Sequence, residues 1–186
     1  MTEPPYLAGQ FLLAMPGIGD PRFERSVIAM CAHDAGGAFG LCLHAELDEI
    51  SLHGLMEQLE IAPGAAPDAP ILAGGPVEPQ RGFVLHSPDY AGQDTRFVAG
   101  RWAITGTRDV LAAIADGRGP RQWVAALGYA GWGEGQLEDE LRRHGWFSCP
   151  GSLALIFETP AAERWARAFR EAGVDPSMLV ADAGRA

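Results

Sequence analysis

The feature of this sequence that most restricts its fold is a glycine-rich stretch, Gly128-Tyr-Ala-Gly-Trp-Gly-Glu-Gly-Gln-Leu-Glu-Asp-Glu-Leu141. Four glycines and two aromatic residues stand close together there, and an acidic amphipathic run follows them. Glycine adopts positive φ values without penalty and lets other groups approach the main chain closely. The stretch therefore predicts a strand over residues 124–129, then a glycine turn, and then a helix that begins near Gln136.

Composition narrows the class of protein. The 186 residues are 47% hydrophobic, which suits one domain over residues 1–186. All 14 basic residues are arginine, and the chain contains neither lysine nor asparagine. It therefore has no P-loop lysine, no Schiff-base lysine and no N-glycosylation site. The net charge of −10 argues against direct nucleic-acid binding, because phosphate binding needs a basic face.

Cysteine usage and the N-terminal sequence indicate the compartment. The three cysteines, at positions 31, 42 and 149, form an odd, low count that favours free thiols in a reducing environment. The first residues lack the basic character of a signal peptide, and no apolar run approaches the ~20 residues of a membrane span. We therefore expect a cytoplasmic protein that does not bind a membrane.

Hydrophobic periodicity predicts strands and helices in an interspersed order. Residues 25–47 are expected to form a β-hairpin around the turn Asp34-Ala-Gly-Gly37. Ser51 is expected to cap a helix over residues 52–59. One early hairpin with helices between later strands favours a mixed sheet with helices packed against it. The other expected strands cover residues 6–15, 71–73, 82–86, 97–99, 102–105 and 154–157, and the other expected helices cover residues 107–117 and 159–173.

Two Cys-x-His pairs suggest a metal site. Cys31 and His33 share one strand and Cys42 and His44 the next, so each pair lies on one face. A hairpin that turns at Gly36-Gly37 would place Cys31 opposite Cys42, and four zinc-type ligands could then converge. The spacing differs from that of familiar zinc pairs, and free cysteine is usually buried. We favour two buried thiols and two histidines at strand ends, and predict no metal.

Catalytic motifs are absent. The chain has no Gly-x-Ser-x-Gly elbow and no His-Glu-x-x-His motif, and we assign no catalytic residue. A small hydrolase or a thiol-dependent enzyme that uses His33 or His86 with a Ser or Cys stays open as the alternative function. Cys149 precedes Pro150 and is interpreted as an inert thiol rather than a reactive one. The acidic side chains at the expected helix start, Glu134, Glu138, Asp139 and Glu140, are interpreted as a solvated face rather than a paired-carboxylate site.

Glycines, aromatic residues and one arginine gather in three segments, over residues 74–81, 83–86 and 128–135. We expect these segments to line a groove that binds an unknown protein or small-molecule partner, and we expect no cofactor. Tight turns without a ligand are the alternative interpretation of the two glycine segments. The predicted groove residues are Gly74, Gly75, Arg81, His86, Tyr129, Gly131, Trp132, Gly135 and Gln136.

Several motifs along the chain, taken together and in their order, resemble those of the bacterial YqgE/AlgH family over about residues 6–184. The resemblance rests on Gly9-Gln-Phe-Leu-Leu-Ala-Met-Pro16, Gly74-Gly-Pro-Val77, Arg81-Gly-Phe-Val-Leu-His86 and Gly128-Tyr-Ala-Gly-Trp132. It implies an α+β fold, a single compact domain with a bent, barrel-like mixed β-sheet and helices packed outside. It also implies a cytosolic bacterial protein.

One branch of the family is described as a transcriptional regulator of exopolysaccharide synthesis, on indirect grounds. This chain shows no helix-turn-helix signature, so the resemblance points to indirect transcriptional regulation. The chain departs from the family pattern at His44 and near His144, where asparagine is usual. A histidine replaces only part of the hydrogen bonding of an asparagine amide. Cys42 also lies outside the family pattern.

Overall fold

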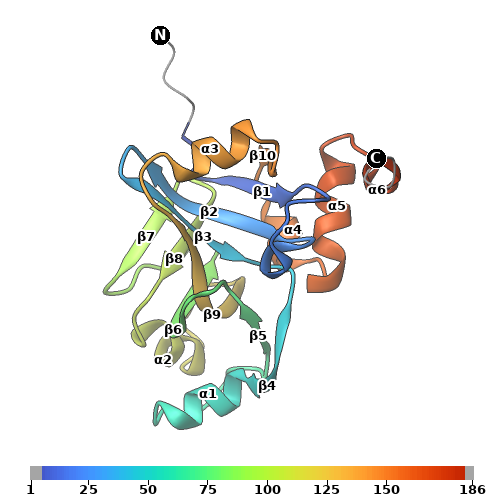
Figure 1. Ribbon diagram of the computed structural model, residues 1–186. Coiled ribbons are helices and arrows are strands. Elements are labelled where there is room, and N and C mark those ends of the chain that lie inside the picture. The colour runs from blue at the N-terminus through green and yellow to red at the C-terminus, as the bar shows by residue number, and fades with distance from the viewer. Residues whose placement is uncertain (1–5, 183–186) are drawn as a thin grey trace.

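A bent, mixed β-sheet forms the centre of the fold, and helices pack outside it (Figure 1). The computed structural model describes the backbone of residues 6–182 and the side chains of residues 6–179. The strands are β1 (Gln10–Ala14), β2 (Val27–Asp34), β3 (Gly37–Cys42), β4 (Glu46–Ser51), β5 (Pro70–Ala73), β6 (Val77–His86), β7 (Thr95–Val98), β8 (Trp102–Thr105), β9 (Trp123–Trp132) and β10 (Trp146–Pro150). Their hydrogen-bonded order is β10-β1-β2-β3-β9-β6-β8-β7, with β4 paired to β5. The pairing of β5 with β9 is parallel, which makes the sheet mixed as the sequence predicts.

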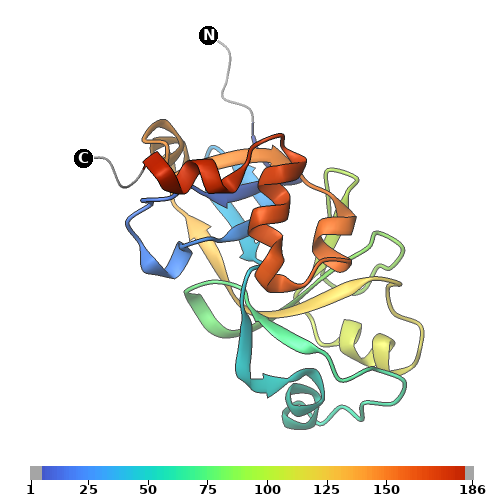
Figure 2. The same cartoon turned by 90° about the vertical axis from the view of Figure 1, so that its right-hand side faces the viewer.

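Three groups of helices each cover a different part of the sheet. The helices are α1 (Leu52–Gln58), α2 (Asp109–Ala115), α3 (Gln136–Arg142), α4 (Leu153–Phe157), α5 (Arg164–Glu171) and α6 (Pro176–Asp182), with short 3-10 helices η1 (Pro21–Phe23) and η2 (Ala161–Glu163). Helices α1 and α2 lie at one end of the molecule, α3 lies at the other, and α4, α5 and α6 lie along one side (Figures 1 and 2). Each group closes its own hydrophobic cluster against the strands.

The β2–β3 hairpin forms around the predicted turn, and a β-bulge changes its register. It is shorter than the expected residues 25–47, because β3 ends at Cys42 and residues 46 and 47 belong to β4, which pairs with β5. The pairs His33–Ala38 and Met30–Gly40 are both formed, with a register shift between Met30 and Ala32. Cys42 consequently pairs with Ile28 rather than with Cys31. The expected pairing of the two thiols is therefore wrong. Because the hairpin turns at Ala35-Gly36 rather than at Gly36-Gly37, an unbroken ladder would already pair Cys42 with Ala29, and the bulge moves Cys42 one residue further, to Ile28.

The two glycine segments pack against each other through their backbones. A Cβ atom on Gly75 would lie 2.1 Å from the carbonyl carbon of Tyr129, and one on Gly128 would lie 2.4 Å from the carbonyl oxygen of Gly75. The Gly74 amide donates to the carbonyl of Leu127 at 2.8 Å, so the segment is also hydrogen bonded to β9. Both segments therefore need glycine for close backbone approach.

Three of the expected elements differ from the structure. The helix expected over residues 159–173 is a 3-10 turn, η2, followed by α5, which begins only at Arg164. Residues 154–157 belong to helix α4 rather than to a strand, because the Ser152 side chain caps the helix by accepting from the Leu155 amide at 3.2 Å. Strand β9 also continues through Trp132, beyond the strand end expected at Tyr129, because β3 pairs with it over residues 130–132.

Several local predictions are confirmed. Helix α3 begins at Gln136, and Gly135 precedes it with φ +72°. The Ser51 side chain accepts from the Gly54 amide and caps α1, and Gly173 follows α5 with positive φ. Within residues 6–182, none of the helices is both long and apolar enough to cross a membrane.

Candidate functional site

A cavity of about 360 Å³ is lined by residues of strands β2, β3, β6, β7, β8 and β9. We call it the aromatic cavity because three aromatic side chains form much of its wall. Its lining residues are Cys31, Ala32, Phe39, Arg81, Phe83, Asp94, Arg96, Ile104, Gly106 and Tyr129.

The three rings of the aromatic cavity contact one another pairwise. The ring centroids lie 5.0 Å apart for Phe39 and Tyr129, 5.4 Å for Phe39 and Phe83, and 5.9 Å for Phe83 and Tyr129. The Phe83 ring meets its two neighbours nearly edge to face, an arrangement that aromatic pairs prefer. Arg81 and Phe83 share a face of β6, and the Arg81 guanidinium lies 5.2 Å from the Phe83 ring centroid.

Strand alternation explains which part of the glycine-rich stretch reaches the cavity. Successive side chains of a strand point to opposite faces. Tyr129 therefore faces the aromatic cavity, and a Cβ on Gly131 would lie 3.3 Å from the Tyr129 ring. Ala130 and Trp132 face the other way, into the cluster closed by Leu137 of α3.

Charged side chains at the edge of the cavity are exposed and weakly paired. Arg81 lies 3.3 Å from Glu78, and Arg96 lies 3.9 Å from Asp94. The two arginine side chains are 54% and 79% exposed. Exposed ion pairs contribute little free energy, so either arginine can exchange its partner for an anionic group of a ligand. A hydrogen bond from Tyr129 to Glu78 raises the pKa of the phenol, which stays protonated at neutral pH.

The thiols of the protein are not activated. Burial raises the pKa of Cys31, in the wall of the cavity, to about 12. Burial likewise raises the pKa of Cys42 to about 12 and that of Cys149 to about 11. Because the thiolate is the nucleophile, none of these thiols is reactive near neutral pH. Cys149 lies on β10 rather than in a loop, and its position agrees with the inert thiol expected from the sequence.

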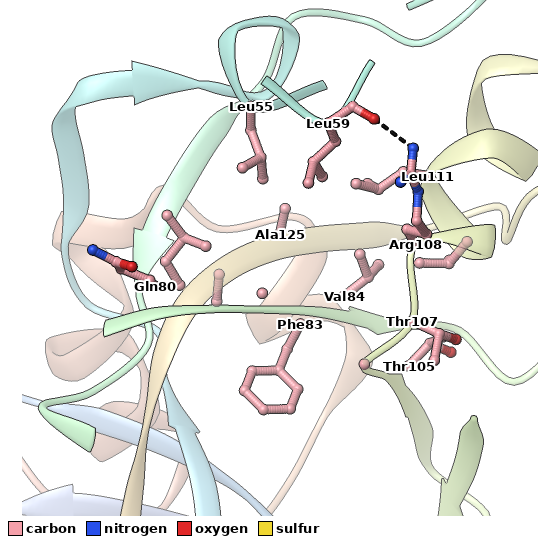
Figure 3. Close-up of a pocket in the computed structure, with 15 residues that line it drawn as sticks. Leu55, Leu59, Gln80, Phe83, Val84, Thr105, Thr107, Arg108, Leu111 and Ala125 are labelled. Atoms are coloured by element: carbon pink, nitrogen blue, oxygen red, sulfur yellow. Dashed lines mark hydrogen bonds between the residues drawn. The ribbon is translucent and has the colours of Figure 1, made fainter. Parts of the chain in front are cut away.

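A second, smaller hollow of about 180 Å³ lies between α1, α2 and the strands β6 and β9 (Figure 3). Leu55, Leu111 and Val84 contribute apolar surface to it, whereas the Phe83 ring points to the opposite side of β6 (Figure 3). At its edge, the Arg108 guanidinium donates a hydrogen bond to the carbonyl oxygen of Leu59. Small-molecule sites combine apolar walls with a few polar groups that fix orientation. Both hollows meet this description, but the aromatic cavity has about twice the volume, and its arginines are held only by exposed ion pairs. We therefore regard the aromatic cavity as the candidate functional site.

The structure brings together only some of the predicted groove residues. Arg81 and Tyr129 line the aromatic cavity, and Gly131 lies beside the Tyr129 ring. Gly74 and Gly75 do not line the cavity; they pack against the backbone of Gly128 and Tyr129 in β9.

The remaining predicted residues lie away from the cavity. Gly135 and Gln136 form the start of α3, where the Gln136 side chain accepts from the Gly133 amide at 3.0 Å. Trp132 is buried, and its indole Nε1 donates to the Glu140 carboxylate at 3.0 Å. His86 is fully buried and is hydrogen bonded inside the sheet.

His86 ends a chain of hydrogen bonds rather than lining a cleft. Its Nδ1 donates to the carbonyl of Ser87 at 2.8 Å, so its Nε2 accepts from the Thr105 hydroxyl at 2.8 Å. Thr105 in turn lies 2.8 Å from the hydroxyl of Thr95. Burial lowers the pKa of His86, which favours the neutral ring that this pattern requires.

His33 is also occupied by structural partners. Its Nδ1 accepts from the Leu7 amide at 3.0 Å, and its Nε2 donates to Glu138 at 2.7 Å. Among the side chains described, neither His33 nor His86 is hydrogen bonded to a serine hydroxyl or a thiol. Ser26 is buried and donates to the carbonyl of Phe23 at 2.7 Å. The geometry therefore does not assemble the nucleophile and base of the alternative enzyme function.

The four residues of the suspected metal site diverge. Cys31 packs against the cluster beneath α4 and α5, whereas Cys42 belongs to the cluster beneath α3, so they lie on opposite faces of the sheet. His44 carries a buried Nδ1 without a hydrogen-bond partner, and burial lowers its pKa. In the part of the chain that the structure describes, no three His, Cys, Asp or Glu side chains group as metal ligands.

Several residues of the site are not predictable from the sequence. Phe39, Asp94 and Arg96 come from β3 and from the segment around β7, which are distant in the sequence from Arg81 and Tyr129. Their only sequence signal is the aromatic or charged side chain itself. The interpretation of the acidic cluster as a solvated face is wrong for two of its members. Glu138 accepts from His33, and Glu140 accepts from the indoles of both Trp132 and Trp146.

The comparisons with known proteins identify the family. A model of the family described as AlgH-like matches residues 11–177. This chain belongs to the AlgH-like family. It is 58% identical to a protein of Rhizorhabdus wittichii and 53% identical to one of Novosphingobium aromaticivorans, each over 100% of both chains. Both relatives are named UPF0301 protein.

Solved structures agree with the fold. The chain is similar to the solution structure of the AlgH protein from Pseudomonas aeruginosa, with a TM-score of 0.80 and 39% identity over 100% of this chain and 99% of that chain. A protein from Corynebacterium diphtheriae has a TM-score of 0.76 at 20% identity, over 96% of this chain and 94% of that chain, which supports the fold alone. The resemblance inferred from the motifs and the α+β fold with a half-barrel sheet are both confirmed.

Proposed function

We propose that this chain is a cytoplasmic binding and regulatory module whose ligand site is the aromatic cavity. The convergence of three rings and the Arg81 guanidinium on one cavity of about 360 Å³ carries the proposal. Small-molecule sites commonly have roughly this size, with aromatic walls and a few polar groups. The geometry favours a flat apolar ring that packs against Phe83 and Tyr129 and directs an anionic group toward Arg81.

The chemistry of the cavity favours binding over catalysis. The Cys31 thiol and the Tyr129 phenol are both protonated at neutral pH, and the Asp94 carboxylate lies beside Arg96. None of these groups is an activated nucleophile or a base hydrogen bonded to one. A module that binds its ligand without converting it is suited to sensing the concentration of that ligand.

The exposed arginines suggest how occupancy could be transmitted. An anionic ligand at Arg81 would displace Glu78 from its exposed ion pair and would change the charge of the surface there. A partner protein that binds this surface would then have different affinities for the occupied and empty forms. We place neither nucleic acid nor membrane in this scheme, because the net charge of −10 opposes the binding of phosphate-rich surfaces.

Native mass spectrometry of the protein purified gently from its own host tests the proposal. We expect an additional small-molecule mass on the parent chain that is lost in Arg81→Ala. Arg118→Ala is the matched control, because Arg118 is also exposed and also forms a short-range pair, with Asp116 at 3.0 Å. A bound mass that persists in Arg81→Ala, or that is lost equally in both variants, would place the ligand outside the aromatic cavity.

A further inference from the structure

Arg164, the first residue of α5, carries its charge in the protein interior. The residue is 6% exposed. Its Nη1 donates to the carbonyl of Leu43 and its Nη2 to the carbonyl of Ile156, both at 2.7 Å. Its buried Nε–H has no acceptor, and Arg164 takes part in none of the ion pairs found among the side chains of residues 6–179.

A buried guanidinium without a carboxylate is unfavourable. Removing a charge from water has a large free-energy cost unless an opposite charge and hydrogen bonds replace the water. Two carbonyl groups use only two of the five N–H donors of a guanidinium. Burial lowers the pKa of Arg164, and the charge of Glu46 opposes this effect without forming an ion pair. The positive charge of Arg164 is therefore incompletely compensated.

Arg164 lines a cavity of about 380 Å³. Trp123, Phe157 and Pro70 contribute flat apolar surface to the same cavity, and Arg121 and Glu46 are its other charged residues. The Arg121 side chain is 91% exposed, and its Nε lies 4.0 Å from Asp89, so it is weakly paired. The formal charge of the lining side chains is +1, from two arginines and one glutamate. The cavity thus combines a buried cation, an exposed outer cation and flat apolar walls.

We propose that this cavity binds a small organic carboxylate with a flat apolar body. The planar fork of a guanidinium matches a carboxylate, and the pairing is strongest where water is excluded. The apolar body would lie against Trp123 and Phe157, and Arg121 would cover the anion from the solvent side. The proposal is independent of the aromatic cavity, because the two cavities share no lining residue.

Benzoate is the probe that tests this site, and benzamide is its neutral control of nearly equal shape. Both are titrated into the ¹⁵N-labelled full-length chain, and NMR follows the indole N–H of Trp123 and the Nε–H signals of the arginines. We expect benzoate to bind about tenfold or more tightly than benzamide, because a charge-assisted pair is stronger than a neutral one. Equal affinity for the two compounds, or no shift of Trp123 with either, would overturn the proposal.

Variants of the charged lining residues test whether these charges determine the affinity for benzoate. Arg164→Met should abolish the preference for benzoate, and Arg121→Ala should weaken benzoate binding about two- to threefold. Glu46→Gln should strengthen benzoate binding by a similar factor, because it removes a repelling carboxylate. Arg170→Ala, an exposed change on the same helix, should leave binding unchanged.

The variants remain decisive if Arg164→Met does not fold, because Glu46→Gln and Arg121→Ala change more exposed positions. A weaker affinity for benzoate in Glu46→Gln would contradict the proposal. That result would mean that the glutamate attracts the ligand rather than repelling it. An effect of Arg170→Ala as large as that of Arg121→Ala would also contradict it, since general surface charge would then explain the binding.

Discussion

Glu140 should be one of the most important side chains of the α3 region for stability. Its Oε2 accepts from the indole Nε1 of Trp132 at 3.0 Å and from that of Trp146 at 2.8 Å. The two tryptophans are only 7% and 5% exposed. Glu140→Ala would leave both indole N–H groups without this acceptor, and each buried unsatisfied donor costs roughly 1–3 kcal/mol. Because Glu140 is half-buried and water can partly replace it, we expect a loss of about 2–4 kcal/mol in the free energy of unfolding.

Urea denaturation followed by far-UV circular dichroism and tryptophan fluorescence measures this loss. Glu140→Gln keeps an oxygen that can accept both indoles but removes the charge, so we expect it to lose only about 1 kcal/mol. Glu134→Ala, at an exposed position just before α3, should change stability by less than about 0.5 kcal/mol. If Glu140→Ala were as stable as Glu134→Ala, the two indole hydrogen bonds would not stabilise the fold and the reasoning would be refuted.

Three further predictions concern stability. His144 has φ +59°, so His144→Gly should raise the free energy of unfolding by about 0.5–1 kcal/mol in urea denaturation, and a loss would contradict the assigned strain. Burial lowers the pKa of His44 and of His86, so the unfolded chain takes up protons that the native chain does not. Stability should therefore fall as the pH drops below about 6.5, by at most about 1.4 kcal/mol per pH unit for each histidine, and unfolding curves that do not change between pH 7 and 5 would be inconsistent with this. Gly75→Ala should cost about 3 kcal/mol or more or prevent folding, whereas Gly117→Ala, with positive φ but open space, should cost only about 1 kcal/mol in thermal unfolding.

Local signals in the sequence were sufficient for the elements that local interactions determine. The hairpin turn at residues 34–37, the cap at Ser51 and the helix start at Gln136 each depend on residues within one or two turns of the chain. Residues 154–157 were misassigned because a short apolar run is compatible with a strand or a helix, and the cap at Ser152 decides between them.

Pairing between distant strands could not be predicted in the same way. The bulge beside Cys31 and the parallel pairing of β5 with β9 depend on contacts with segments far away in the sequence. These features decide the composition of the candidate site, because they determine which face each side chain occupies. Continuation of β9 places Tyr129 in the aromatic cavity but turns Trp132 to the other face. Phe39 and Arg96 join Tyr129 only through the assembled sheet.

The aromatic cavity should hold the natural ligand of this protein. The most direct test is an NMR titration of the uniformly labelled chain with a small-molecule extract of its host, followed through the aromatic ring signals. We predict concentration-dependent shifts at Phe39, Phe83 and Tyr129, with intermolecular nuclear Overhauser effects that place the ligand between these rings. Ring signals that stay unchanged at every concentration, while signals elsewhere in the chain respond, would contradict the claim.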